Sequence, residues 1–319
     1  MDLYQELIAC LKKELEQHDP AYTVPEIPQK DVDARWEVFK KWGNTKEWCK
    51  HRSQAREMLS TYFNALWRKI EPIPRRVEIS QELQRKRGTL ALDKDLTKAV
   101  EQIQDELTIG ADVNAHLSKL TQRLDKFDML LNQWHIFHFH LGLTMDSKSK
   151  FYKRTGSLLL AYFPLDEAAA YFLDVIPAHR KEQNPDAFSD QTYLKIIKRN
   201  WPNLLNDSVI GLGGSWISNK SMREDAWDKH KNTVALAEDR FTLPMAGGVT
   251  TQGGSAYVEL QANRLLGKVL DWEKQDYGIE PEKFLGEGKT LPAGFRIDGR
   301  VLLLVEKSNG KVLDFYKMI

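Results

Sequence analysis

The sequence predicts an α+β protein with a helical N-terminal region, a small central antiparallel sheet accompanied by a helical hairpin, and a C-terminal mixed α/β domain. Three observations support this class. Apolar residues recur at three- and four-residue steps near the N-terminus, aromatic and branched residues crowd together at 134–176, and glycine-rich loops appear after about residue 205. We therefore predict an N-terminal region 1–74, a core 75–205 and a C-terminal domain 206–319.

The N-terminal region should consist of helices. Tyr4, Leu7, Leu11 and Leu15 share one helical face, and this helix should end at Asp19-Pro20. Further helices are expected over 35–42 and 45–70, and a short strand over 77–79, after two prolines stop the long helix.

The central region should contain a helical hairpin followed by three strands. Apolar stripes predict two helices that turn at Gly110, and a helix should also follow the strands, capped by Ser189 and closed before Pro202. The third strand could instead be a short helix, because it begins with acidic residues and three alanines. The predicted hairpin helices cover 93–109 and 113–131, and the predicted strands cover 134–141, 157–163 and 169–176.

The C-terminal domain should combine one helix with a strand pair. Apolar spacing predicts a helix over 258–269, and the sequence Ser-Asn-Gly at 308–310 marks a turn between two strands. The glycine-rich stretches at 211–214 and 246–254 lack the Gly-Lys-Ser/Thr ending of a phosphate-binding loop. We interpret them as turns or hinges.

Composition limits the class of protein. The chain has 319 residues with 46 basic and 45 acidic side chains, so a nucleic-acid site would have to be a local patch. The two cysteines are far apart in the sequence, which indicates neither a disulfide framework nor a thiolate zinc site. No run approaches the ~20 apolar residues needed to span a bilayer, and no basic leader precedes an apolar stretch. We expect a cytoplasmic protein with no membrane partner and no cofactor.

The stretch Trp-His-Ile-Phe-His-Phe-His-Leu-Gly at 134–142 holds three of the eight histidines. Because side chains alternate along a strand, His138 and His140 should lie on one face and His135 on the other. Three roles are open for the pair, which are acid–base catalysis, a structural role in the core, and metal binding with His179 as the third ligand.

Basic residues at the strand ends favour a catalytic role. Arg154 precedes the second strand and His179 follows the third, so both could face His138 and His140 in an antiparallel meander. Imidazole and guanidinium groups suit phosphodiester cleavage, with His138 or His140 as base, Arg154 stabilising the charge on phosphorus, and His179 as acid. Lys153, Arg180 and Lys181 would contact the nucleic acid, unless they are only solvated charges.

The order of these elements resembles a known family. A helical hairpin, a strand, the sequence Arg-Thr-Gly-Ser-Leu-Leu-Leu-Ala-Tyr-Phe at 154–163, a tight turn, and an apolar strand ending in His-Arg-Lys at 179–181 are similar to the core of the RelE/ParE superfamily of toxins. The resemblance covers residues 93–181 of a chain about three times as long as a typical member. It implies metal-independent cleavage of mRNA, often on the ribosome, by a toxin or phage-defence effector with an antitoxin-like protein partner.

A basic segment supports a second class of function. Residues 68–87 hold seven basic and three acidic side chains, among them Arg75 and Arg76, which could contact a nucleic-acid backbone. The chain would then be a non-enzymatic protein that binds nucleic acid or a protein partner, with structural histidines. A metal-dependent hydrolase using His138, His140 and His179 is the third class.

Overall fold

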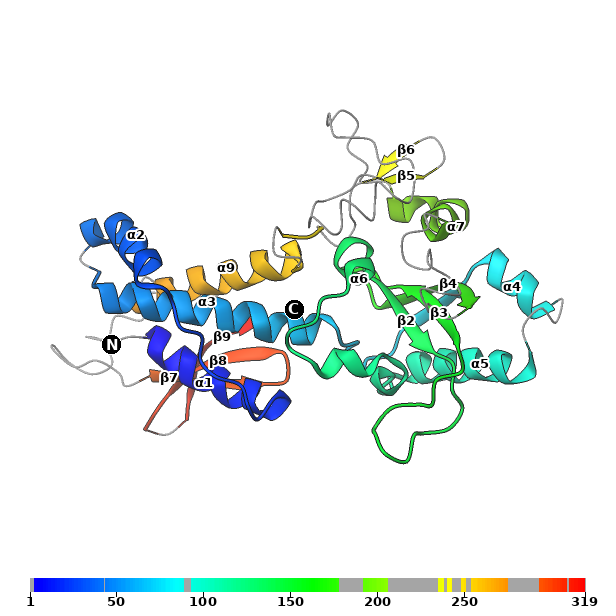
Figure 1. Ribbon diagram of the computed structural model, residues 1–319, viewed down its shortest axis with the longest axis horizontal. Coiled ribbons are helices and arrows are strands. Elements are labelled where there is room, and N and C mark those ends of the chain that lie inside the picture. The colour runs from blue at the N-terminus through cyan, green and yellow to red at the C-terminus, as the bar shows by residue number, and fades with distance from the viewer. Residues whose placement is uncertain are drawn as a thin grey trace. The chain divides into compact units, whose positions relative to one another are not determined.

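The computed structural model has an α+β fold and divides into two compact units (Figure 1). The terminal unit comprises 1–67, 122–125 and 258–319, and the central unit comprises 68–121 and 126–257. The residues described are 3–42, 44–88, 93–177, 192–205, 235–237, 240–242, 248–250, 254–274, 293–308 and 310–318.

The terminal unit contains helices from both ends of the chain and one sheet. The three antiparallel strands follow the order β7-β8-β9, and β8 and β9 are paired on either side of the Ser-Asn-Gly sequence as expected. Its elements are α1 (Leu3–His18), α2 (Gln29–Phe39), η1 (Lys40–Trp42), α3 (Lys46–Trp67), α9 (Ala256–Lys274), β7 (Ala293–Asp298), β8 (Val301–Glu306) and β9 (Val312–Lys317).

The structure groups these regions differently from their order along the chain. Tyr4 on α1 is fully buried and its hydroxyl donates to the carbonyl of Leu266 on α9 at 3.1 Å. Trp48 Nε1 on α3 donates to Glu273 Oε2 on α9 at 2.9 Å. Residues 1–67 of the first predicted region therefore share one unit with 258–319 of the last, whereas 206–257 are grouped with the central unit. The apolar stripe of α1 needs a partner, and local sequence patterns do not show that this partner lies over 200 residues away.

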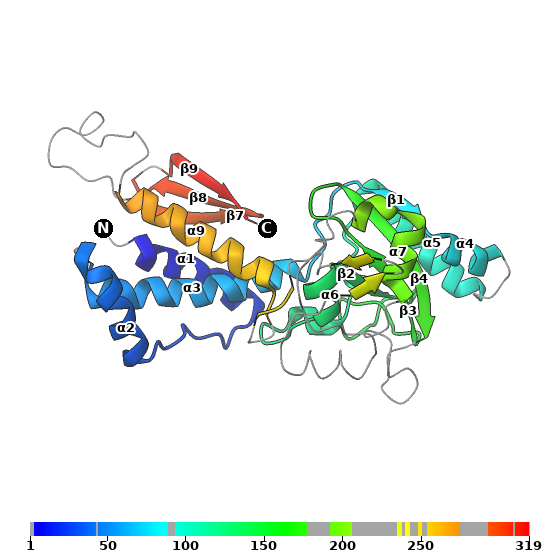
Figure 2. The ribbon, with the colours of Figure 1, turned by 90° about the horizontal axis from the view of Figure 1, so that it is seen from above.

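The central unit contains the mixed sheet and the helices around it (Figure 2). It includes all three predicted central strands. Its elements are β1 (Arg76–Ile79), α4 (Gln81–Gly88), α5 (Lys94–Ile109), η2 (Asn114–His116), η3 (Lys119–Gln122), α6 (Met129–Trp134), β2 (Ile136–His140), β3 (Ser157–Tyr162), β4 (Ala169–Pro177), α7 (Thr192–Asn200), η4 (Pro202–Leu205), β5 (Ala235–Ala237) and β6 (Arg240–Thr242).

The sheet of the central unit has the strand order β1-β4-β3-β2. Strands β2, β3 and β4 form the expected antiparallel meander, with His138 opposite Leu160 and His140 opposite Leu158. Strand β1 adds to the edge in parallel with β4, so the sheet is mixed. Residues 169–177 pair on both sides, which shows that the third element is a strand and not the alternative helix.

Helices α6 and α7 cover one face of this sheet, and α5 lies on the opposite side (Figure 1). Trp134 on α6 is almost completely buried, and so are Tyr193 and Ile197 on α7; all three share a core with Ile136 and Leu173. Such burial removes apolar surface from water at about 25 cal/mol per Å², and it fixes α6 against the start of β2.

The second limb of the predicted hairpin is not a continuous helix. The 113–131 segment forms two 3₁₀ turns and the first residues of α6. Asp112 Oδ1 accepts from the backbone N–H of Asn114, and Asn114 exchanges two side-chain hydrogen bonds with the backbone of Ile70. Short polar side chains that bond the backbone compete with helix formation, which explains the break after Gly110.

No helix in the described part of the chain is both long enough and apolar enough to cross a bilayer.

Candidate active site

A cavity of about 410 Å³ lies within the central unit, between η3, the start of α6 and strand β2. This volume is in the range of small-ligand sites. Its wall is mostly apolar and includes four residues with ionisable side chains. These four are Arg68, Lys126, Asp128 and His138.

His138 and Asp128 face one another across this wall. The Nδ1 atom of His138 lies 3.5 Å from Oδ2 of Asp128, and the side chains are 14% and 27% exposed. A carboxylate that lies beside an imidazole can orient the ring for acid–base chemistry. The pair is therefore a candidate acid–base group.

Local sequence explains why these two residues meet. Asp128 is the N-cap of α6, and its Oδ1 accepts from the backbone N–H of Leu131 at 3.1 Å. Helix α6 lasts six residues and ends at His135, whose left-handed backbone conformation, with φ of 52°, reverses the chain into β2. His135 Nδ1 contacts the carbonyl oxygen of Phe163, which ties this turn to the end of β3. The turn directs β2 back along α6, so His138 returns to the level of Asp128.

Two cations also line the cavity. Arg68 is only 3% exposed, and its Nη1 donates to the carbonyl oxygen of Leu120 at 3.0 Å. This bond helps to fix the side chain of Arg68, which is one of the residues that line the cavity. Lys126 lies two residues before Asp128 and is also one of the residues that line the cavity. The charges suit a ligand that carries an anionic group.

Exposed apolar side chains stand at the rim of the cavity. Phe127 is 48% exposed and Leu120 is 50% exposed, although both are large and apolar. Phe137 lines the interior and is buried. An exposed aromatic ring beside cations is a typical stacking surface for an unpaired nucleobase.

Of the histidine pair predicted from the sequence, only His138 lines the cavity. The two rings lie on one side of β2, as alternation predicts, with their centroids 6.4 Å apart. His140 is 5% exposed, however, and packs in the interior. His135 does not belong to the strand at all, because it caps α6.

Lys153 and Arg154 are exposed residues in the segment between β2 and β3, and neither is among the residues that line the cavity. The structure therefore does not place Arg154 in the wall of the cavity that His138 lines. The predicted residues His179, Arg180 and Lys181, and the Ser189 cap, lie outside the described residues. Within the described ranges, no three His, Cys, Asp or Glu side chains gather closely enough to hold a metal ion.

A buried polar cluster supports β2 from the other side. His116 is fully buried, its Nε2 lies 3.2 Å from Glu106 Oε2, and its Nδ1 lies 3.3 Å from the carbonyl oxygen of His140. Its ring stacks on Tyr152 at 3.8 Å. Burial lowers the pKa of His116, and Glu106 and the His140 carbonyl only partly oppose this shift. The cluster holds the last residue of β2 next to the cavity-lining residue Leu117.

The basic segment 68–87 uses most of its charges within the protein. Arg76 pairs with Glu78 and Glu167, Lys86 with Asp174, and Arg87 with Glu101. Arg75 lies over the ring of Phe163 at 5.5 Å and donates to the carbonyl of Glu71 at 3.4 Å.

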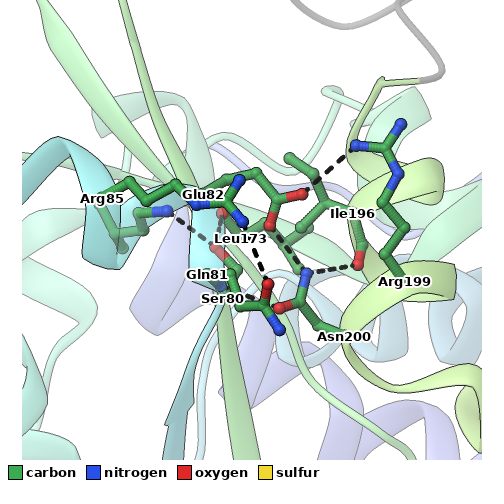
Figure 3. A network of polar contacts seen from close by, with 9 residues as sticks. Ser80, Gln81, Glu82, Arg85, Leu173, Ile196, Arg199 and Asn200 are labelled. Atoms are coloured by element: carbon green, nitrogen blue, oxygen red, sulfur yellow. Dashed lines mark hydrogen bonds and ion pairs between the residues drawn. The ribbon is translucent and has the colours of Figure 1, made fainter.

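Figure 3 shows how the start of α4 is tied to α7. Asn200 Oδ1 accepts from the backbone N–H of Gln81, its Nδ2 donates to Glu82 Oε2, and Arg199 pairs with Glu82 at 3.5 Å. Arg85 donates to Gln81 Oε1 in the same network. These contacts give the segment a structural role in joining α4 to the sheet and to α7.

Sequence reasoning missed Asp128, Arg68 and Lys126 as site residues. One signal was present, because Asp128 stands three residues before Leu131 at the start of a short apolar run, as an N-cap does. An N-cap there would have ended the predicted helix 113–131 early and placed a carboxylate near the histidine strand. Nothing in the sequence indicates that Arg68, 70 residues before His138, lines the same cavity.

Comparisons with protein-family models, with curated protein sequences and with solved structures found no match to this chain.

Proposed function

We propose that the central unit is a metal-independent endoribonuclease whose acid–base group is His138. The single observation that carries this proposal is the His138–Asp128 pair, 3.5 Å apart, at a cavity that Arg68 and Lys126 also line. Cations beside an acid–base group suit a phosphodiester substrate, since negative charge increases on phosphorus during its cleavage. The exposed ring of Phe127 adds a surface on which an unpaired base can stack.

In the proposed reaction, His138 takes the proton of a ribose 2′-hydroxyl and the freed oxygen attacks the adjacent phosphorus. The bond from phosphorus to the 5′-oxygen of the next nucleotide breaks, and an acid protonates that leaving oxygen. Arg68 and Lys126 stabilise the negative charge on the phosphorane, and Asp128 stabilises the imidazolium of His138. The products are a 2′,3′-cyclic phosphate and a 5′-hydroxyl. His179 stays the predicted acid.

This chemistry modifies the assignment made from the sequence. Arg68 and Lys126 take the place of Arg154 in stabilising charge, and His140 becomes a buried support of the strand. Apart from Arg68, we do not place the main nucleic-acid surface on the basic segment 68–87, because Arg76, Lys86 and Arg87 already pair with carboxylates of the protein. A toxin or phage-defence role on the ribosome, with an antitoxin-like partner, remains a prediction of the resemblance.

The test is cleavage of a single-stranded RNA by the purified full chain in EDTA. His138→Ala should lower the rate by about 100-fold or more, as loss of a general base does. The same RNA with 2′-deoxy sugars should not be cut, because the nucleophile is missing. His18→Ala, which removes a half-buried histidine at the end of α1, is the matched control and should keep full activity.

Equal cleavage by His138→Ala and by the unchanged protein would remove the proposal. Cleavage that appears only when a divalent metal is added would support the metal-dependent hydrolase instead. If the chain cuts no RNA under either condition, the non-enzymatic binding class remains. The 2′-deoxy substrate would then serve as a ligand with which to measure binding.

A further inference from the structure

The segment between β2 and β3 concentrates positive charge on one loop, residues 143–154, which we call the basic loop. It carries Lys148, Lys150, Lys153 and Arg154 and a single carboxylate, Asp146. Figure 1 shows it as the long green loop that extends away from the sheet at the end of β2. All four cations are exposed.

The backbone of the basic loop is held in place by contacts at both ends. Gly142 packs so closely against Lys153 that a Cβ atom there would lie 2.0 Å from the Lys153 carbonyl oxygen. The backbone N–H of Asp146 donates to Phe151 at 2.8 Å, and that of Tyr152 donates to Ala115 at 3.0 Å. Phe151 itself is 7% exposed and anchors the loop. The cations are therefore presented by a folded surface.

The four cations have no carboxylate partner within the described part of the chain. Asp146, the carboxylate of the loop, instead accepts from Lys119 Nζ at 2.7 Å, from the backbone N–H of Lys148 at 3.1 Å and from Ser149 Oγ at 3.0 Å. Other exposed cations do pair with acids, as Arg76 does with Glu167 and Lys307 with Glu6. A phosphate can bind the basic loop without first breaking an ion pair. In the segment 68–87, by contrast, Arg76, Lys86 and Arg87 would first have to release a carboxylate.

The ion pair between Lys119 and Asp146 also connects the basic loop to the cavity. Lys119 lies between Ser118 and Leu120, which both line the cavity, so a short stretch of backbone joins the two features. A chain with regularly spaced anionic groups could place one unit in the cavity and its neighbours along the loop. Single-stranded RNA has this spacing of charge, with one phosphate per nucleotide.

We infer that the basic loop binds the phosphate backbone of single-stranded RNA and holds the strand beside the cavity. This inference rests on the proposed function for its choice of polymer. Counterion release gives a slope of about −0.7 in log affinity against log salt for each phosphate contact with a single strand, so four contacts contribute about −2.8. Between 50 and 200 mM salt, these contacts alone would account for an affinity loss of about 50-fold.

The test measures binding and not cleavage. The full chain with His138→Ala, which should not cut the probe, is titrated against a fluorescently labelled single-stranded RNA by anisotropy at several salt concentrations. The loop variant adds Lys148→Gln, Lys150→Gln, Lys153→Gln and Arg154→Gln. The matched control instead adds Lys12→Gln, Lys40→Gln, Lys46→Gln and Lys307→Gln, which remove four exposed cations that have carboxylate partners.

The loop variant should bind at least 10-fold more weakly at 50 mM salt and lose about 3 from the salt slope, while the control keeps the slope of the parent. Equal affinities for the loop variant and the parent would overturn the inference, and so would an equal loss in the control. Polyglutamate that competes as well as RNA would show that the loop binds an acidic protein instead. If the chain binds RNA through the loop but never cuts it, the proposed reaction is wrong and this inference stands. If the chain cuts RNA but does not bind it through the loop, this inference is wrong and the proposed reaction stands.

Discussion

Asp128 has two structural roles that two substitutions can separate. Its Oδ1 caps α6 and its Oδ2 faces His138. Asp128→Asn keeps a good N-cap and removes the charge, whereas Asp128→Ala removes both. The cap is worth about 1 kcal/mol, so the alanine variant should melt about 2 to 4 °C lower, and the asparagine variant should melt close to the unchanged protein.

The charge of Asp128 should matter for the rate. At 3.5 Å, an imidazolium and a carboxylate attract one another by about 1 kcal/mol at the dielectric constant of water and by about 5 kcal/mol at an effective value of 20. Both side chains keep partial solvent contact, at 14% and 27%, so the lower half of this range applies. At 1.4 kcal/mol for each factor of ten, Asp128→Asn should cut RNA about 10- to 100-fold more slowly.

The assay is the single-turnover rate of RNA cleavage in EDTA, measured beside the thermal melting midpoint of each variant. Asp128→Asn should lose rate without losing stability, and Asp128→Ala should lose both. If Asp128→Asn keeps the full rate while Asp128→Ala loses it in proportion to its lower stability, Asp128 acts only as a cap and the reasoning about the dyad is wrong.

Three further changes test the packing around the site. Gly142→Ala should destabilise the protein by about 1 to 3 kcal/mol, because its Cβ would collide with the Lys153 carbonyl, while Gly267→Ala in α9, with open space around it, should be neutral or stabilising; melting midpoints of the two distinguish them. Phe139→Ala should cost about 3 to 5 kcal/mol in denaturant unfolding, since this ring is fully buried in β2. Because burial lowers the pKa of His116 below its ordinary value of 6.5, its stabilising contribution is complete above pH 6.5 and is lost as pH falls through the folded-state pKa. The melting midpoint should therefore fall more steeply below pH 6.5 in the unchanged protein than in His116→Gln, and parallel curves would contradict this.

The central sheet was predictable because the local composition of each strand is sufficient to indicate a strand. Residues 136–140, 157–162 and 169–177 are rich in aromatic and branched side chains, so the sequence pattern predicted each of these strands to within two residues at each end. Strand β1 was also predicted, at 77–79. Its parallel pairing with β4 depends on a partner about 90 residues further along the chain, which no local pattern shows.

The hairpin prediction was wrong in its second limb because it counted apolar spacing and ignored the polar residues between. Val113, Leu117 and Leu131 have helical spacing, but Asp112, Asn114 and Asp128 use their side chains to bond the backbone and divide the segment.

Because of that error, the sequence prediction also missed most residues of the candidate site. The sequence found His138 and its shared face with His140, which follow from alternation alone. It missed Arg68, Lys126 and Asp128, because their approach to His138 depends on the broken segment and on the left-handed turn at His135.

The central claim is that His138 acts as the acid–base group of a metal-independent ribonuclease. The most direct measurement is the single-turnover rate of cleavage of one single-stranded RNA in EDTA by the unchanged protein and by His138→Ala, with mass analysis of the product ends. The account predicts 2′,3′-cyclic phosphate and 5′-hydroxyl ends and a rate about 100-fold or more lower in the variant, at an unchanged melting midpoint. Equal rates in the two proteins, or products with 3′-hydroxyl ends, would contradict it.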